Sequence, residues 1–300
     1  VFFFFFLGVV AKRRVKHWQD RVTLVDVGII IILCLVFFLT FYPFFYTLSL
    51  AVMPYENYVQ QSVHVLPSGF TLRAFREIFE TPNLARSYAN SVLKTGLGTT
   101  LSVIFTVMAG YVMSRKELRL RRFLMGLFIV PMWFGGGIIA YYLVIRAVGL
   151  LNTFWAMVIP GLVAPTSMLL VRAYYHDYPQ EVIDAAIVDG AGHFRIFFSI
   201  IWPTSKPIIA TMALLIGTAH WNDYFWPSLI VPQEWQPATV ILQRMTLNRS
   251  LFQSLGLGVQ TVHQSFIAAV ASCLILPVLF VYPFLQRYIV KGIMIGSIKG

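Results

Sequence analysis

Charged residues are scarce in this sequence, where they make up 12% of the 300 residues. A soluble globular protein has about twice that share. Hydrophobic residues make up 58% and aromatic residues 16%. This composition excludes an ordinary water-soluble domain and predicts a chain surrounded by membrane lipid.

Cysteine is rare, and the common catalytic motifs are absent. Cys34 and Cys273 both lie in apolar runs, which excludes a disulfide framework and indicates buried, inert thiols. The sequence has no Gly-x-x-x-x-Gly-Lys-Ser/Thr phosphate loop, no Gly-x-Ser-x-Gly elbow and no His-Glu-x-x-His pair. We therefore expect no catalytic residue, no metal site and no cofactor bound by this chain, so that any ATP would be hydrolysed by another polypeptide.

Long apolar stretches are what the sequence has instead. A helix needs about 20 apolar residues to cross the hydrocarbon core of a bilayer. Six stretches reach that length, and they predict an all-α membrane protein with six transmembrane helices: Val27 to Leu48, Ser91 to Met113, Phe123 to Ile145, Phe154 to Tyr174, Pro207 to Ile230 and Phe266 to Tyr288. Between the first two, Leu72, Phe75, Ile78 and Phe79 have helical spacing and predict an interfacial amphipathic helix.

The basic residues are distributed unevenly between the two sides of this predicted topology. Of the 23 Lys and Arg residues, 16 lie in the N-terminal flank, the 115–122 loop, the surroundings of residues 177–206 and the C-terminal flank. The other seven, Lys94 among them, fall on the opposite loops and helix ends. The positive-inside rule then places both termini and the 177–206 loop in the cytoplasm. The net charge of +11 reflects topology, which excludes nucleic acid as a partner.

The predicted organisation has three parts. Residues 1–23 form a cytoplasmic N-terminal segment, whose apolar residues 1–10 are too short to span a membrane. Residues 24–290 form the six-helix transmembrane domain, and residues 291–300 form a cytoplasmic tail.

A polar island, Pro179 to Pro203, interrupts the apolar stretches. Pro179 suits a first helical position, and Asp184 places negative charge near a helix N-terminus. We expect a short helix to about Asp189, a turn at Gly190, and a second helix that Pro203 ends. Two short helices at a sharp angle predict a contact surface for another protein.

A second polar cluster, His220 to Tyr224, lies within the fifth predicted span. An ionisable group at such depth is costly, so His220 and Asp223 should face a cavity, water or a polar partner. The alternative is that Asp223 lies at the outer interface, where Trp and Tyr are common. Asn222, flanked by Trp221 and Tyr224, offers hydrogen bonds and stacking faces that suit a sugar ring. The five residues are therefore candidates for a substrate pathway.

The polar island resembles a known motif. Asp184-Ala-Ala-Ile-Val-Asp-Gly-Ala-Gly192, followed by Phe194, Phe197 and Pro203, is similar to the EAA loop of permeases in binding-protein-dependent ABC importers. Asp184 stands where the family usually has Glu. Outside the island, Trp221-Asn222 and Trp226-Pro227 resemble the maltose-type permeases of the carbohydrate group. Phe134-Gly-Gly-Gly137 and Gly149 to Gly161 resemble the oligosaccharide branch, which includes a permease of the alginate importer.

The resemblance implies a type I ABC importer permease in the bacterial inner membrane. It implies a second permease subunit as partner, two ATPase subunits that hold ATP and Mg²⁺, and a periplasmic or surface-anchored sugar-binding protein. The island would be the coupling loop that docks on the ATPase. Ala185, Ala186 and Gly190 would allow close approach, Asp184 and Asp189 would make polar contacts or cap helices, and Phe194 and Phe197 would be aromatic anchors.

Some alternatives remain open at this stage. Phe197 and Phe198 can instead pack against the chain's own helices, and we expect one of the two to meet the partner. An ion-coupled secondary transporter or a structural subunit of a membrane complex is a different possible function. An ion-coupled carrier needs several ionisable residues at mid-membrane depth, whereas His220 and Asp223 stand nearly alone in the predicted spans.

Overall fold

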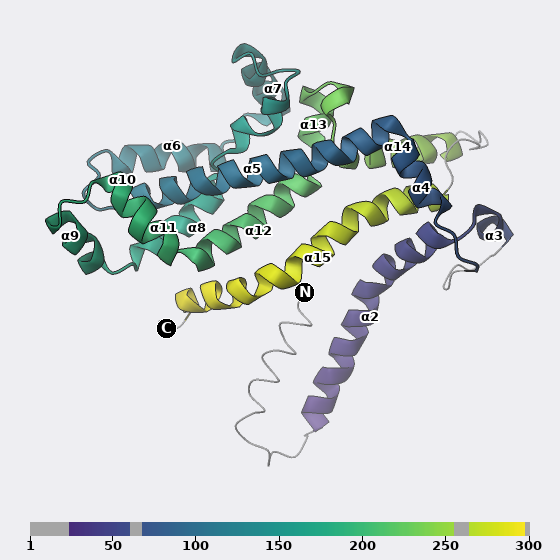
Figure 1. Ribbon diagram of the computed structural model, residues 1–300, viewed down its shortest axis with the longest axis horizontal. Helices are drawn as coiled ribbons and strands as arrows, with labels where there is room; N and C mark the ends of the chain where they lie inside the picture. Colours follow the sequence, from purple (N-terminus) through teal and green to yellow (C-terminus); the bar gives the residue numbers. More distant parts are fainter. Residues whose placement is uncertain (1–23, 61–67, 255–263, 298–300) are drawn as a thin grey trace. The chain divides into compact units, whose positions relative to one another are not determined.

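The computed structural model describes residues 24–60, 68–254 and 264–297. Every regular element in these ranges is a helix (Figure 1), which confirms the predicted all-α class. The predicted N-terminal segment 1–23, with its apolar residues 1–10, lies outside the described residues. In the predicted tail, the last helix continues to Ser297, and residues 298–300 are outside the described ranges.

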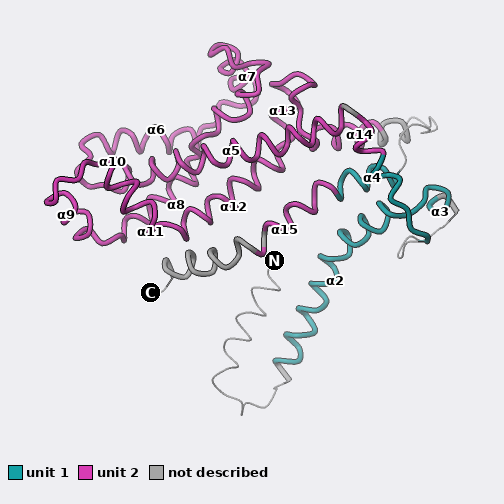
Figure 2. The backbone as a smooth tube through the Cα atoms, viewed as in Figure 1, with its two compact units in different colours: residues 1–76, 260–272 teal, residues 77–259, 273–300 magenta. Residues whose placement is uncertain are grey.

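The chain divides into two compact units (Figure 2): residues 1–76 with 260–272, and residues 77–259 with 273–300. Two helices contribute to both units, α4 (Arg73–Glu80) and α15 (Gln264–Ser297). The α4 helix is the amphipathic helix that the spacing of its apolar residues predicts.

The first unit contains α2 (Leu24–Val52) and α3 (Tyr55–Gln60). Apolar side chains along most of α2 are exposed, including Ile32 at 63% and Phe38 at 69%, as a helix in contact with lipid requires. Its C-terminal end is buried at Leu50 and Ala51. There the backbone amide of Thr71 donates to the carbonyl of Val52 at 2.8 Å and ties the following loop to the helix end.

The second unit is built around α5 (Pro82–Ser114), which packs against α8 (Pro165–His176) and α12 (Lys206–Asn222). A buried cluster of this unit includes Val107, Val171 and Met212, one from each of these three helices. The other elements of this unit are α6 (Arg121–Trp133), α7 (Gly137–Ala147), the 3-10 helices η1 (Phe154–Met157), η2 (Ile159–Gly161) and η4 (Gln233–Trp235), α9 (Gln180–Val188), α10 (His193–Ile196), the π-helix η3 (Phe197–Ile201), α11 (Trp202–Thr204), α13 (Phe225–Ile230) and α14 (Ala238–Ser254).

Three of the predicted spans are continuous helices. In the described residues, α2, α5 and the first part of α15 are long and apolar enough to cross a membrane, and joining two bent helix pairs raises the number to five. The third predicted span is interrupted between α6 and α7, next to Pro131 and the glycines 135–137. The fifth breaks at Asp223 and Tyr224, between α12 and α13. The count of six spans stays a prediction.

Candidate functional site

The 177–206 loop folds as two short helices joined by a turn. The first helix, α9, covers Gln180–Val188, close to the predicted range, with Pro179 as its N-cap residue. Its C-terminus forms a Schellman motif, because the amide of Ala191 donates to the carbonyl of Ala186 and the amide of Gly190 to that of Ile187. Gly190 has a φ of +77°, a left-handed conformation that favours glycine. The predicted turn at Gly190 is therefore present.

One side of this loop is anchored in the chain's own core. Ile183, Ala186, Ile196 and Phe197 are buried in the cluster that α5, α8 and α12 build. The Phe197 ring lies 5.5 Å, centroid to centroid, from that of Tyr111 in α5. The structure thus gives Phe197 the packing position that was the alternative to a partner contact, and it leaves Phe198 half exposed.

The other side of the loop carries exposed apolar side chains. Val188 at the end of α9 is 86% exposed, and Phe194 in α10 is 71% exposed. Ile187 and Val182 are exposed at 47% and 42%. Side chains of this size and exposure next to an anchored face are typical of a protein contact surface.

Three further residues that we expect to contact the partner lie on the surface of the loop. Asp184, Ala185 and Asp189 are exposed. The Asp184 carboxylate accepts a hydrogen bond from Gln180 Nε2 at 2.9 Å, and Gln180 Oε1 accepts one from Arg115 Nη1 at 2.9 Å. Arg115 directly follows α5. Asp184 is therefore linked through one glutamine to the end of the central helix.

The second half of the loop ends at Ser205, two residues later than predicted. Pro203 lies inside the short α11 helix, which directly continues the π-helix η3. Ser205 is fully buried, accepts a hydrogen bond from Tyr175 Oη at 2.8 Å and donates one to the Ile201 carbonyl at 2.6 Å. After Ser205 the chain turns by 82° into α12.

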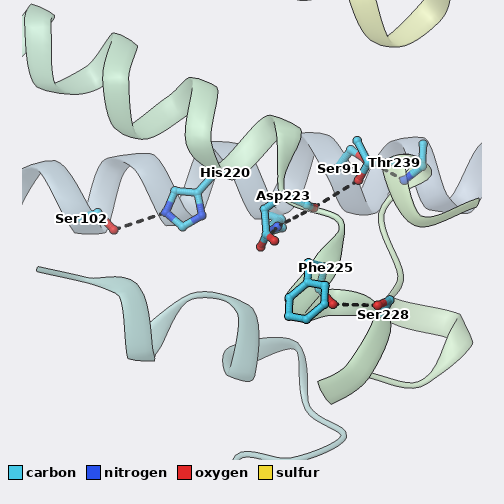
Figure 3. A network of polar contacts seen from close by, with 9 residues as sticks. Ser91, Ser102, His220, Asp223, Phe225, Ser228 and Thr239 are labelled. Atoms are coloured by element: carbon cyan, nitrogen blue, oxygen red, sulfur yellow. Dashed lines mark hydrogen bonds and ion pairs between the residues drawn. The ribbon is translucent and has the colours of Figure 1, made fainter. Parts of the chain in front are cut away.

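The second candidate cluster lies where α12 meets α5. His220 Nε2 lies 3.4 Å from Ser102 Oγ, and Figure 3 shows the ring turned toward that serine. The ring also fills the space beside Gly98, because a Cβ atom at position 98 would lie 2.9 Å from His220 Cε1. The predicted polar partner of His220 is thus a serine on the second predicted span.

Asp223 is held by a buried cation. Lys94 Nζ in α5 lies 2.8 Å from Asp223 Oδ2, and it also donates to the Asp223 carbonyl at 3.3 Å. The lysine side chain is 0% exposed and the aspartate side chain 28%. The structure gives Asp223 a polar partner, and its position relative to the outer interface stays a prediction.

Lys94 was missed as a site residue, and its expected place at a loop or helix end is wrong. It lies inside α5, within a continuous apolar window. The signal was available, because a lysine in a spanning stretch requires a counter-charge, and Asp223 lies in another predicted span.

The other three residues of the cluster differ in exposure. Trp221 is buried, and its Nε1 donates to the Leu274 carbonyl in α15 at 2.9 Å, so the ring packs within the chain. Asn222 is exposed, and Tyr224 is 41% exposed. Asn222 and Tyr224 can therefore meet a ligand or a partner, and the pathway role of the cluster stays a prediction.

Metal-ligand groups do not assemble in the described part of the chain, where no three His, Cys, Asp or Glu side chains are placed to hold an ion. The expectation that this chain binds no cofactor stays a prediction.

Comparisons with known proteins agree on one class. Residues 102–295 match the family model "Binding-protein-dependent transport system inner membrane component". The chain is 34% identical over 267 residues to Protein LplC of Bacillus subtilis (strain 168), covering 87% of this chain and 90% of that protein. It is 32% identical over 264 residues to the polygalacturonan/rhamnogalacturonan transport system permease protein YtcP of the same organism, with 86% and 92% covered.

A solved structure is similar over nearly the whole chain. It is the crystal structure of a bacterial ABC transporter involved in the import of the acidic polysaccharide alginate. One of its chains matches with a TM-score of 0.81 and 26% sequence identity, covering 91% of this chain and 99% of that chain.

Proposed function

Because the chain belongs to the inner-membrane components of binding-protein-dependent transport systems, we propose that it is one of two different permease subunits in an ATP-driven importer of oligosaccharides. Its membership in the sugar ABC permeases is established by its relatives, as is its non-catalytic role. Membership also favours ATP-driven import over the ion-coupled carrier and the structural subunit that the sequence left open.

The observation that carries the proposal is the two-sided 177–206 loop. Its inner side is buried against α5, α8 and α12, whereas Val188 and Phe194 are exposed on its outer side. A loop with this arrangement can transmit force, because a push on its outer side reaches the central helices through side chains that are already in contact. The proposed partner of the outer side is an ATPase subunit, which binds the ATP and Mg²⁺.

In this proposal, closure of two ATPase subunits on ATP moves the loop and switches the permease pair from inward-open to outward-open. A sugar-binding protein then delivers the substrate to the open cavity. Both termini and the loop lie in the cytoplasm, as the distribution of Lys and Arg predicts. Gly190 sets the turn, and Asp184, Ala185 and Asp189 lie on the exposed surface that meets the ATPase.

The substrate class is proposed from the relatives. Protein YtcP is described as a polygalacturonan/rhamnogalacturonan permease, and the similar solved structure comes from an importer of acidic alginate. We expect an oligosaccharide, and an acidic one is consistent with both. Asn222 and Tyr224, the exposed members of the 220–224 cluster, are the proposed substrate contacts.

The test of the coupling role is retention of the ATPase by a loop variant. The Phe194→Ala variant removes a ring that is 71% exposed, and the matched control Phe123→Ala removes one that is 65% exposed on α6. Loss of an aromatic anchor at an interface typically costs about 2 kcal/mol or more, roughly a thirtyfold loss of affinity. We expect Phe194→Ala to co-purify with far less ATPase and the control to match the native chain. Equal retention by both variants would contradict the proposal.

A further inference from the structure

The Lys94–Asp223 ion pair lies where three helices of the second unit meet. Lys94 comes from α5, Asp223 is the C-cap residue of α12, and Thr239 of α14 donates its hydroxyl to the Asp223 carbonyl at 3.2 Å. The Asp223 carbonyl therefore receives hydrogen bonds from two side chains on two other helices. Figure 3 shows Asp223 and Thr239 in this arrangement.

The lysine satisfies two electrostatic requirements at once. Its ammonium group neutralises the carboxylate at a distance typical of a charge-assisted hydrogen bond. It also lies at the C-terminus of α12, where unpaired carbonyls favour a positive charge. Lys94 is fully buried and Asp223 is partly exposed, so the aspartate is the member of the pair that reaches the surface.

The aspartate lies at the point where the fifth predicted span changes direction. At Asp223 the backbone leaves the helical conformation, with φ −70° and ψ 116°, and α13 begins after Tyr224. The exposed residues Asn222 and Tyr224 flank it on either side. Any shift of Asp223 therefore changes the direction in which both of these side chains point.

We propose that Lys94 is a positioning residue, which fixes the break between α12 and α13 through Asp223 and so orients Asn222 and Tyr224 toward the transport pathway. The pathway itself rests on the proposed function. The orientation of Tyr224 does not depend on the proposed function. An experiment that measures this orientation therefore tests the role of Lys94 separately from the role of the chain in import.

The experiment compares three forms of the full importer complex in membranes. The first has the native Lys94 and Asp223, the second has Lys94→Met, and the third has Lys94→Met with Asp223→Asn. All carry Tyr224→Cys as a reporter, with Cys34→Ser and Cys273→Ser to remove the native thiols. The readouts are the amount of assembled complex and the rate of labelling of the reporter by a membrane-impermeant maleimide.

The single variant leaves a carboxylate without its counter-ion, and such a loss is strongly destabilising, whereas removal of both charges is often tolerated. We expect at least a tenfold loss of complex for Lys94→Met and recovery to within twofold in the double variant. The recovered complex should nevertheless label at position 224 at a rate at least fivefold different from the native pair. A merely structural ion pair would restore the labelling rate along with the amount, and that result would overturn the proposal.

A milder variant covers the case in which the double variant also fails to assemble. Thr239→Val removes the second donor to the Asp223 carbonyl and leaves the ion pair in place. We expect normal amounts of complex and a labelling rate within twofold of the native form, because Lys94 still holds Asp223. A larger change would assign the position of the break to Thr239 and would overturn the proposal. Failure of the proposed function would appear in a different experiment, as unaltered ATPase retention by the Phe194→Ala variant. That result would leave the labelling rates at position 224 unchanged.

Discussion

Close approach of α5 and α8 depends on the missing side chain of Gly110. A Cβ atom at this position would lie 2.5 Å from Val171 Cγ1, 2.6 Å from Val171 Cβ and 3.0 Å from the Arg172 backbone nitrogen. Nonbonded carbon atoms prefer about 3.5–4.0 Å, so Gly110→Ala forces the two helices apart by about 1 Å. Such overpacking typically costs about 1–3 kcal/mol.

A second glycine in the same helix provides a control, for which the expected change in the free energy of unfolding has the opposite sign. Gly96 also lies in α5, but nothing lies within 4 Å of a Cβ atom placed there. Alanine is more favourable than glycine in a helix interior by about 0.5–1 kcal/mol. Gly96→Ala should therefore raise the free energy of unfolding by about 0.5–1 kcal/mol. Gly110→Ala should lower it by up to about 2.5 kcal/mol, which is the packing cost less the same propensity gain.

The measurement is the free energy of unfolding of the purified chain in detergent micelles, obtained by denaturant titration. Adding Val171→Ala to Gly110→Ala removes the nearest atom but leaves Val171 Cβ and the Arg172 backbone in place. We expect that double variant to recover less than half of the loss. A Gly110→Ala chain as stable as Gly96→Ala would refute the close approach of α5 and α8.

Two further predictions concern the 177–206 loop. Gly190→Val should lower the free energy of unfolding by about 1–2 kcal/mol, because a branched side chain disfavours the left-handed conformation. Gly190→Asn should lower it by much less, because asparagine adopts this conformation more easily and nothing lies within 4 Å of an added Cβ atom. Equal thermal stability of the two variants would contradict this prediction. Tyr175→Phe removes the buried hydrogen bond to Ser205 and should cost about 1 kcal/mol, measured by the same denaturant titration. Tyr178→Phe, at an exposed hydroxyl pair, should cost less than half as much, and a larger loss there would count against the buried contact.

Sequence reasoning succeeded where a single local signal determined the structure. The apolar runs of α2, α5 and α15 are long enough to predict helices, and the Gly190 turn follows from the left-handed conformation that glycine adopts easily. The helix–turn–helix form of the 177–206 loop was predicted for the same reason. These features depend on neighbouring residues in the chain.

Two failures have a different cause, since each depends on contacts between distant segments. Phe197 and Phe198 are adjacent phenylalanines, and only the packing against Tyr111 determines that the first is buried. Lys94 appeared to be a helix-end charge because its partner Asp223 comes much later in the chain. The break at Asp223 has a local cause. A short polar interruption barely changes the mean hydropathy over a window long enough to span a membrane, so hydropathy alone does not predict the break.

The contact between Gly98 and His220 has a consequence for how this sequence can change over time. The imidazole ring occupies the space in which a side chain at position 98 would begin. A lineage that acquires alanine or serine at position 98 must therefore move the imidazole ring away from α5 or replace the histidine with a smaller residue. One position lies in α5 and the other in α12, so we expect substitutions at one to be accompanied by substitutions at the other among descendants of this chain.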